Sequence, residues 1–245
     1  MKLYLVGGAV RDHLLGMRSK DLDFAVEADS FEEMTQELVA HHGLHIYQSR
    51  PEFVTLRGRI PLGPDNFGGI PKGHEYCSVD ADFTLCRKEA QYHDRRHPSS
   101  VTPADILTDL SRRDFTINAI AVAMNGNYID PYGGRRDLEC RILHTVGLAQ
   151  ARFDEDPLRI LRAVRFICNL DLYESSDIFW AFQKSHIVDL LKTLPVERIR
   201  QELNQVKHWR KLMYEIMSKH PLIGDSLERY FPTLTFRAEI GDRNE

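Results

Sequence analysis

The sequence lacks any feature that would carry it into or across a membrane. No apolar run reaches the roughly 18 residues that a membrane-spanning helix needs. The N-terminus MKLYLVGGAVRD has no basic region followed by an apolar stretch and a cleavage site. Hydrophobic residues nevertheless make up 42% of the 245 residues, which is enough for an ordinary buried core. We therefore expect a globular protein of the cytoplasm with no membrane partner.

Cysteine is scarce and irregularly placed. The four cysteines, Cys77, Cys86, Cys140 and Cys168, match neither a disulfide framework nor a CxxC metal site. The 11 histidines include no HExxH motif and no other metal-ligating spacing. The sequence thus predicts buried thiols and no zinc site.

An excess of positive charge is also missing, because the formal net charge is −4. Binding to a nucleic acid calls for clustered Lys and Arg, so the distribution of charge says more than its total. Residues 21–37 hold seven acids and no Lys or Arg, whereas residues 192–219 hold seven Lys or Arg against three acids. An acidic segment near one end and a basic segment near the other could serve a protein that brings a negatively charged polymer to metal ions. Ordinary solvated helix faces would give the same pattern.

The first half of the sequence predicts strands and helices in turn. Strands are expected at 2–6, 21–26, 45–47, 53–60 and 76–85. A short helix follows Gly8 and ends at Gly16, and Ser30 with Glu33 forms a capping box before a helix at 32–42 that Gly43 ends. The segment PLGPDNFGGIPKG at 61–73 is a loop by composition, long enough for a flap or an insertion.

The pattern changes from Ser111 onward. DFTINAIAVAM at 114–124 has helical apolar spacing, and NGNYIDPYGG at 125–134 predicts a turn, a short strand and a second turn. Residues 154–219 are dominated by helical periodicity. The sequence therefore predicts an α+β first part and an all-helical second part.

Two aspartates are spaced one residue apart in the predicted strand DLDFAV. Side chains alternate along a strand, so Asp21 and Asp23 point to the same side while Leu22 points into the core. A third acid, Asp82, lies on a strand that could be brought beside this pair. Three oxygen donors suit Mg²⁺, and two such ions support in-line phosphoryl displacement. An edge strand with two solvated acids is the alternative for the pair taken alone.

A glycine pair precedes these acids. Gly7 and Gly8 let the backbone approach a ligand closely, and the helix that follows offers its N-terminus to an anion. Arg11 could then hold a phosphate. Together, the glycines, the arginine and the acids favour a nucleotide-phosphate site with metal ions.

GGAVRDHLLGMRSKDLDF at 7–24 resembles the signature of the class II tRNA nucleotidyltransferases, which are the CCA-adding enzymes and their relatives the bacterial poly(A) polymerases. The resemblance continues in order through RRDFTINAIAV at 112–122, DPYGGRRDL at 130–138, RFDEDPLRILRAVRF at 152–166 and, more faintly, ERIRQEL at 197–203. It implies a polymerase-β-like catalytic head with a small mixed sheet flanked by helices at 1–140, and an all-helical neck at 141–205. A short helical segment would follow at 206–245.

The resemblance implies roles for individual residues of the head. Asp21, Asp23 and Asp82 would be the catalytic metal ligands, and Gly7, Gly8 and Arg11 would cradle the triphosphate. Asp114 and Asn118 would sense the ribose, and Arg112 or Arg113 would hold phosphates. Without the resemblance, a helix cap at Asp114 with a solvated Asn118 would account for the same residues. Gly133 and Gly134 resemble the hinge between head and neck.

In the neck, the resemblance assigns base selection to Glu155, Asp156, Arg159 and Arg162. Asp156 and Arg159 would hydrogen-bond the Watson–Crick edge of the incoming base, since Arg presents planar donors and Asp accepts from an amine. Glu155, Asp156 and Arg159 would share one helix face, with Pro157 in the first turn of a helix. A capping acid with a salt bridge along the helix is the alternative.

The implied reaction is the attack of an RNA 3′-hydroxyl on the α-phosphate of CTP or ATP with release of pyrophosphate. The expected partners are Mg²⁺ and the tRNA 3′ end. Family members usually continue into body and tail domains, which are largely missing here, so a homo-oligomer or a partner protein could supply the remaining grip. Partial CC- or A-addition, poly(A) tailing, a catalytically reduced RNA- or nucleotide-binding protein, and transfer to a small molecule or protein all stay open.

Overall fold

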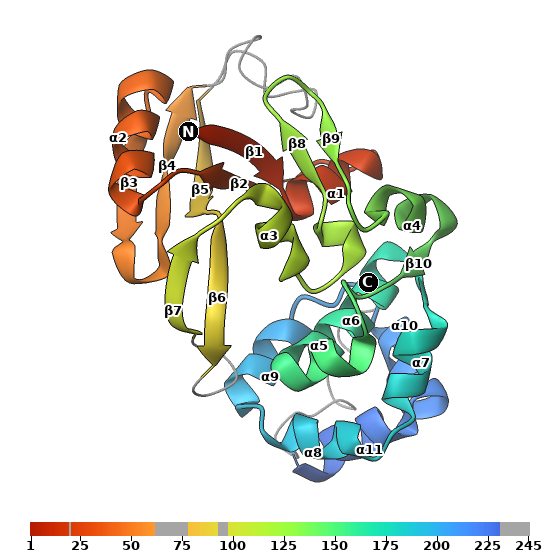
Figure 1. The fold of residues 1–245 in the computed structure, drawn as a ribbon. Helices are drawn as coiled ribbons and strands as arrows, with labels where there is room; N and C mark the ends of the chain where they lie inside the picture. Colours follow the sequence, from red (N-terminus) through yellow and green to blue (C-terminus); the bar gives the residue numbers. More distant parts are fainter. Residues whose placement is uncertain (20, 62–77, 93–97, 231–245) are drawn as a thin grey trace. The chain divides into compact units, whose positions relative to one another are not determined.

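A computed structural model describes residues 1–19, 21–61, 78–92 and 98–230 of the chain. The chain divides into two compact units, Met1–Leu138 and Glu139–Glu245 (Figure 1). Most of the predicted loop at 61–73 lies outside the described residues, and so does Cys77.

The first unit is built on a seven-stranded mixed sheet in the order β3-β4-β5-β2-β1-β8-β9. Its strands are β1 (Lys2–Val6), β2 (Leu22–Glu27), β3 (His45–Arg50), β4 (Thr55–Pro61), β5 (Ser78–Leu85), β8 (Ala121–Ala123) and β9 (Tyr128–Ile129). β2 and β5 run parallel, and the other neighbouring pairs of this sheet run antiparallel. The predicted strands of the first half are thus present, but β3 is longer than expected and β4 begins two residues late, after the 3-10 turn η1 (Pro51–Phe53). Residues 76–77 of the predicted strand 76–85 lie outside the described residues.

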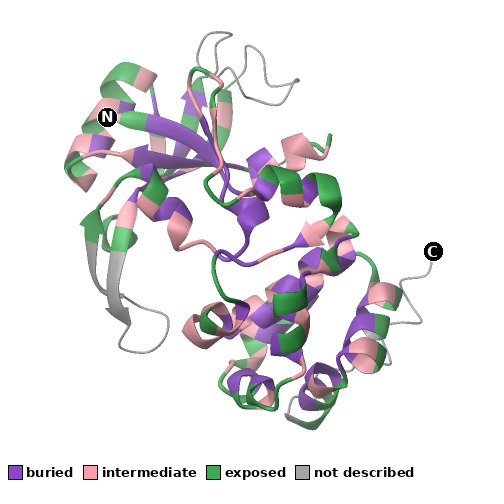
Figure 2. Cartoon of the chain, turned by 45° about the vertical axis from the view of Figure 1, so that its right-hand side comes forward, coloured by how far each residue is buried: buried purple, intermediate pink, exposed green. Residues whose placement is uncertain are grey.

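Burial explains why β2 lies near the centre of the sheet. Leu22, Phe24 and Val26 are almost completely buried, whereas Asp23 between them is exposed. The Phe24 ring stacks on Phe83 of β5 with centroids 5.1 Å apart, so the two parallel strands share one core face. Figure 2 shows β1 and β2 buried along most of their length.

Helices of the first unit pack against this sheet. α1 (Gly8–Leu14) contacts β1 and β2, α2 (Phe31–His42) contacts β4, and α3 (Ile106–Ser111) contacts β2. The predicted ends of α2 are confirmed. The Ser30 hydroxyl accepts a hydrogen bond from the Glu33 N–H at 3.0 Å, and Gly43 ends the helix in the left-handed region at φ 65°.

The predicted helix at 114–124 is wrong. The segment forms one 3-10 turn, η2 (Thr116–Asn118), and then enters the sheet as β8 between β1 and β9. Ile117, Ile120 and Val122 are all buried, so the apolar spacing reflects burial on several sides rather than one helix face. Periodicity alone does not separate a short buried strand from a helix.

A second, smaller sheet joins β6 (Arg87–Tyr92) and β7 (Pro98–Pro103) in an antiparallel pair. The sequence predicted neither this pair nor α3. Asp105 marks the start of α3, because its side chain accepts from the Thr108 N–H at 2.8 Å. That capping signal was present in the sequence but was not used.

The glycine pair of DPYGG serves a tight backbone approach. Gly133 lies in the left-handed region at φ 73°, and Gly134 begins α4 (Gly134–Cys140). A Cβ at Gly134 would collide with the backbone carbonyl of Thr116. Local geometry therefore requires glycine here, and the hinge role stays a prediction.

Up to Tyr230, the second unit is helical except for one short parallel bridge and the connecting loops. Its helices are α5 (Ala149–Glu155), α6 (Leu158–Leu170), α7 (Ser176–Phe182), α8 (His186–Lys192), α9 (Val196–Leu203), α10 (Trp209–Met213), the π-helix η3 (Tyr214–Lys219) and α11 (Pro221–Tyr230). β10 (Ile142–Leu143) pairs with β11 (Tyr173–Glu174), a two-residue exception within the predicted helical second part.

The ERIRQEL motif has a structural role in this unit. It forms α9, which packs on α6, and its Glu202 is only 7% exposed. The Glu202 carboxylate accepts from Arg165 Nε at 2.7 Å and lies 3.8 Å from Arg162. This buried carboxylate connects α9 to α6.

The cysteines differ in part from expectation. Cys86 and Cys168 are buried, and burial raises the pKa of the Cys168 thiol to about 12, but Cys140 is exposed.

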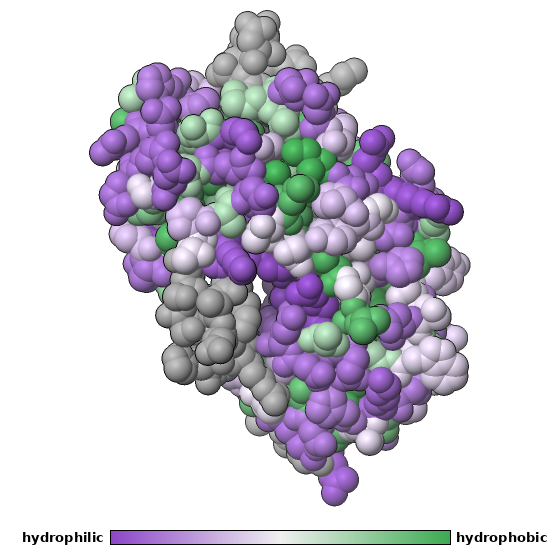
Figure 3. Space-filling model, viewed as in Figure 1, coloured by the Kyte–Doolittle hydropathy of each residue, from purple (hydrophilic) through white to green (hydrophobic). Residues whose placement is uncertain are grey.

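Hydrophilic residues cover most of the described surface in the view of Figure 3. Within the described part of the chain, the helices are either too short or too polar to cross a membrane.

Candidate functional site

The strand register places charged residues in one row across the face of the sheet. Asp23 of β2 is the parallel partner of Asp82 of β5, and Asp82 is the antiparallel partner of Arg57 of β4. Register partners on neighbouring strands project to the same face. Asp21 comes directly before β2 and is exposed. The structure therefore brings the predicted third acid beside the DxD pair.

The carboxylates of this row oppose one another electrostatically. Although the Asp23 side chain reaches the surface of the sheet, the groups around it partly withdraw its carboxylate from water, which raises its pKa. The charges of Asp82 and Asp21 raise the pKa further, whereas those of Arg113 and Arg57 lower it. Two acids that face each other resist joint ionisation, and a bound cation relieves that repulsion. A set of carboxylate oxygens with this repulsion fits a hard divalent cation.

Gly7 lies against the same carboxylate. A Cβ there would sit 3.3 Å from Arg113 Nη1 and 3.7 Å from Asp23 Oδ2. Gly7 also adopts φ 69°, a conformation that favours glycine. Gly8 begins α1, which spans only seven residues, so the anion-binding capacity of this corner rests on its arginines rather than on a long helix dipole.

Arg11 is held by a chain of hydrogen bonds that reaches Asp114. Arg11 Nη1 donates to Asn118 Oδ1 at 2.9 Å, and Asn118 Nδ2 donates to Asp114 Oδ1 at 3.1 Å. Asp114 and Asn118 are 9% and 7% exposed. Asp114 lies before η2 and Asn118 is its last residue, so their side chains meet across this turn. The network fixes the direction of the Arg11 guanidinium.

Asp109 orients the arginine pair and was missed in the sequence. It is 1% exposed and accepts from Arg112 Nη2 at 2.6 Å and from Arg113 Nη2 at 3.1 Å. Burial alone would raise the pKa of Asp109, but the two guanidinium groups hold it below its ordinary value. The spacing of Asp109 three and four residues before the arginines was the available signal. Of the two arginines, Arg113 is the one at the carboxylate row, since a Cβ at Gly7 would meet both Arg113 Nη1 and Asp23 Oδ2.

The predicted base-selecting residues lie in the second unit, at the junction of α5 and α6. α5 ends at Glu155, and Asp156 adopts an extended conformation as its C-cap, so Glu155, Asp156 and Arg159 do not share one helix face. Pro157 is the N-cap of α6 rather than a residue within its first turn. The Asp156 carboxylate accepts from the Leu158 N–H at 3.0 Å, which is a capping contact.

Glu155 holds two arginines together in this junction. Its Oε2 accepts from Arg159 Nη1 at 2.7 Å and from Arg152 Nη1 at 2.8 Å. The Arg159 side chain is 13% exposed and also donates to the Arg152 carbonyl at 3.3 Å. Arg162 lies one turn further along α6, over the ring of Phe166. The salt bridge that the alternative interpretation expected is present, and it fixes the Arg159 guanidinium in one orientation.

The basic segment at 192–219 does not present all of its charge to a ligand. Lys192 pairs with Asp189, Arg200 with Glu197 and Lys211 with Asp171. These contacts favour the interpretation of ordinary ion-paired helix faces for this segment.

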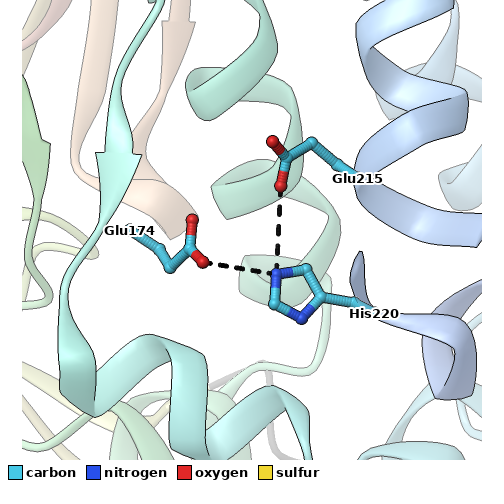
Figure 4. Close-up of side chains that lie close together, drawn as sticks. All are labelled: Glu174, Glu215 and His220. Carbon is cyan, nitrogen blue, oxygen red and sulfur yellow. Dashed lines mark ion pairs between the residues drawn. The ribbon is translucent and has the colours of Figure 1, made fainter. Parts of the chain in front are cut away.

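A second acidic cluster lies in the interior of the second unit. Glu174 and Glu215 both point at the His220 ring, with His220 Nε2 3.6 Å and 3.9 Å from their oxygens (Figure 4). Atoms of these three residues that could bind a metal lie within 4.8 Å of one another. However, the Lys219 ammonium contacts Glu174 at 2.6 Å and Glu215 at 3.4 Å. Because lysine supplies the positive charge, we assign this cluster to the stability of the fold.

Replacing Glu174 with glutamine is expected to flatten the acid sensitivity of the protein. Burial alone would raise the pKa of Glu174, but the nearby His220 ring at 3.6 Å and the hydrogen bond from Lys219 at 2.6 Å hold it at about 2, below the ordinary 4.5. The carboxylate therefore contributes stability above pH 4.5, and this contribution is lost as the pH falls to about 2. The shift corresponds to about 3 kcal/mol at neutral pH.

Urea unfolding at a series of pH values checks this prediction. Glu174→Gln should be less stable than the wild type at pH 7, and the difference should shrink between pH 5 and pH 2. Glu197→Gln serves as the control, because Glu197 forms an exposed pair with Arg200 and should change little. A constant difference between wild type and Glu174→Gln across this range would refute the assignment.

Comparison with known proteins adds the family. The family model described as the poly A polymerase head domain matches residues 3–144, more than half of the chain. The chain belongs to this family. Membership implies the use of a divalent metal ion, for which the carboxylate row provides suitable donors.

Relatives within the family carry more specific names. A CCA-adding enzyme from Geobacillus thermodenitrificans is 37% identical over 83% of this chain and 45% of its own length. An A-adding tRNA nucleotidyltransferase from Aquifex aeolicus is 36% identical over 83% of this chain and 23% of its own. A solved tRNA nucleotidyltransferase with a primer tRNA and an incoming ATP analog matches 97% of this chain and 59% of its own, with 32% identity and a TM-score of 0.62. The chain thus spans about half or less of the length of these curated relatives.

Proposed function

We propose that the chain is a cytoplasmic RNA nucleotidyltransferase that adds CMP and AMP to the 3′ end of tRNA. The observation that carries the proposal is the row of Asp23 and Asp82, with Asp21 before it and with Gly7 and Arg113 against Asp23. This arrangement combines metal-binding oxygens with a fixed cation for phosphate. The names of the relatives support tRNA as the acceptor.

In the proposed reaction, the 3′-oxygen of the RNA attacks the α-phosphorus of CTP or ATP and loses its proton. The bond from that phosphorus to the α,β-bridging oxygen breaks, and pyrophosphate leaves. Asp21, Asp23 and Asp82 would hold Mg²⁺, which activates the attacking hydroxyl and stabilises the leaving oxygens when bound.

The remaining residues bind and orient the nucleotide. Arg113 and Arg11 would neutralise the triphosphate, since Asp109 and Asn118 fix their guanidinium groups in place. Preorganised donors cost little reorganisation during the reaction. Arg159 would donate to the Watson–Crick edge of the base, and Asp156 would accept from its amine if it exchanges its capping contact for the base.

The test offers Mg²⁺ and tRNA transcripts that end before CCA, after C and after CC to the purified 245-residue chain. CTP and ATP are supplied singly and together, and products are resolved at single-nucleotide resolution. We expect addition of C, C and A that stops there and that disappears in an Asp21→Ala/Asp23→Ala double variant. Light scattering of the same samples tests the predicted homo-oligomer.

Other products would assign other functions. Addition of A alone after CC would indicate a partial activity like that named for the Aquifex relative. Long A tails on diverse RNAs, with indifference to CTP, would indicate poly(A) tailing. No incorporation on any transcript would overturn the proposal.

A further inference from the structure

A polar groove lies beside the carboxylate row, on the side of β3 and β4. It has a volume of about 340 Å³ and includes Asp82 in its wall. Two rows of register partners form it, Gln48 with Arg57 and Asp82, and Arg50 with Thr55 and Thr84. Six of the seven lining residues carry polar side chains, Leu56 being the exception, and the two arginines outnumber the one acid. The groove therefore favours a polar, negatively charged ligand.

The ion pair at the edge of the groove is loose. Arg57 Nη1 lies 3.7 Å from Asp82 Oδ2, and the two side chains are 51% and 41% exposed. Arg59, two residues along the same strand, makes a tighter contact of 2.9 Å with Asp80. A long, solvated ion pair contributes little free energy, so Arg57 can exchange its partner at low cost.

The groove and the glycine corner lie on opposite sides of the row. Val6 of β1 is the antiparallel partner of Asp23. Gly7, the residue after Val6, therefore lies past Asp23 in the direction of the start of β2. Thr84 lies two residues beyond Asp82, toward the end of β5. Arg57 belongs to β4, which pairs with β5 on the side away from β2. In-line displacement places the attacking and leaving oxygens on opposite sides of the phosphorus. If the triphosphate lies at Gly7 and Arg113, the attacking strand must come from the other side.

We propose that this groove holds the 3′-terminal nucleotide of the acceptor RNA, and that Arg57 leaves Asp82 to bind the phosphodiester of that strand. The inference rests on the proposed function and names the acceptor site within it. The exchange has a consequence for the reaction. When Arg57 moves to the RNA, its positive charge no longer lies beside Asp82. Arg57 is thus a positioning residue.

The first experiment measures steady-state extension of tRNA by Arg57→Gln. The KM for RNA should rise about 10-fold, as expected for the loss of one charge-assisted phosphate contact, while the KM for CTP and ATP stays within about 2-fold. The salt dependence of log KM for RNA should lose about 0.7 in slope, the value for one phosphate of a single strand. Arg57→Lys should restore the salt slope.

Arg59→Gln is the matched control, because Arg59 lies on the same strand and face with a similar exposure of 53%. It should leave both KM values near those of the wild type. An equal effect of Arg59→Gln would show a general charge effect and refute the specific site. A rise in the KM for nucleotide with no change for RNA would place Arg57 on the triphosphate instead.

A second experiment does not depend on turnover. Fluorescence anisotropy with a short single-stranded RNA that ends in CC measures binding without nucleotide. Asp82→Asn should bind this RNA several-fold more tightly than the wild type, since Arg57 then needs no exchange, and Arg57→Gln should cancel the gain. Asp80→Asn removes the same charge from the neighbouring pair and should bind like the wild type. If the wild type extends tRNA but Asp82→Asn and Asp80→Asn bind alike, the groove is refuted while the proposed function stands.

Discussion

Replacing Asp23 with asparagine is expected to lower the rate of nucleotidyl transfer by about 10³-fold or more, because one of the metal-binding oxygens is lost. The same substitution should raise the melting temperature of the metal-free protein by a few degrees. Loss of activity with a gain in stability distinguishes a functional carboxylate from a structural one.

The sign of the stability change follows from the pKa of Asp23, which burial and the charges of Asp82 and Asp21 raise above its ordinary value. For an acid with a raised pKa, the fold disfavours the charged form. The penalty is absent below the unfolded pKa, grows as the pH rises from the unfolded to the folded pKa, and is complete above the folded pKa. The wild type therefore carries the penalty at pH 7, and an uncharged amide of the same shape does not.

Thermal unfolding with and without Mg²⁺ checks this prediction. Mg²⁺ should raise the melting temperature of the wild type, because it binds only the folded state, and should raise that of Asp23→Asn much less. The control is Asp80→Asn, which changes a solvated acid two residues before Asp82. A lower melting temperature for Asp23→Asn in the absence of metal would show that the carboxylate stabilises the fold, contrary to this assignment.

Local patterns of the sequence were sufficient to predict the direction of Asp23 but not its surroundings. Alternation along a strand depends on backbone geometry alone, so the exposed Asp23 between buried Leu22 and Phe24 follows from six residues of sequence. The pairing of β2 with β5 joins residues about sixty positions apart, and no local rule sets that register. The order of the strands also places Arg57 beside Asp82, which the sequence did not indicate.

The failures of the sequence analysis arise where tertiary packing, rather than the local pattern, decides the structure. The segment from Asp114 to Met124 was predicted as a helix because its apolar residues recur, but β8 lies between two other strands. Asp109 was overlooked although its spacing to Arg112 and Arg113 was visible, because the local sequence does not show that this acid is buried. In the second unit, the change from α5 to α6 at Asp156 breaks a helix that periodicity alone would have continued.

Arg159→Lys is expected to lower kcat/KM for both CTP and ATP by about 10²-fold, because lysine keeps the charge but loses the planar donors that read the base. The incorporation of UTP and GTP should fall less, so discrimination between bases should be reduced. Glu155 holds the Arg159 guanidinium at 2.7 Å and Arg152 at 2.8 Å, so it fixes the direction of those donors. Glu155→Gln should accordingly weaken discrimination as well, by about 10-fold, since it keeps a hydrogen bond but loses the charge.

Single-nucleotide extension with each of the four nucleotides measures this change directly. Arg200→Lys is the control, because Arg200 forms an exposed pair with Glu197 on α9 and should leave the choice of base unaltered. Melting temperatures of the variants separate loss of selectivity from loss of fold. A uniform loss for all four nucleotides would show that Arg159 only supports the α5 to α6 junction. Retained preference for C and A would then have to come from residues other than Arg159, and the base-selecting role would be withdrawn.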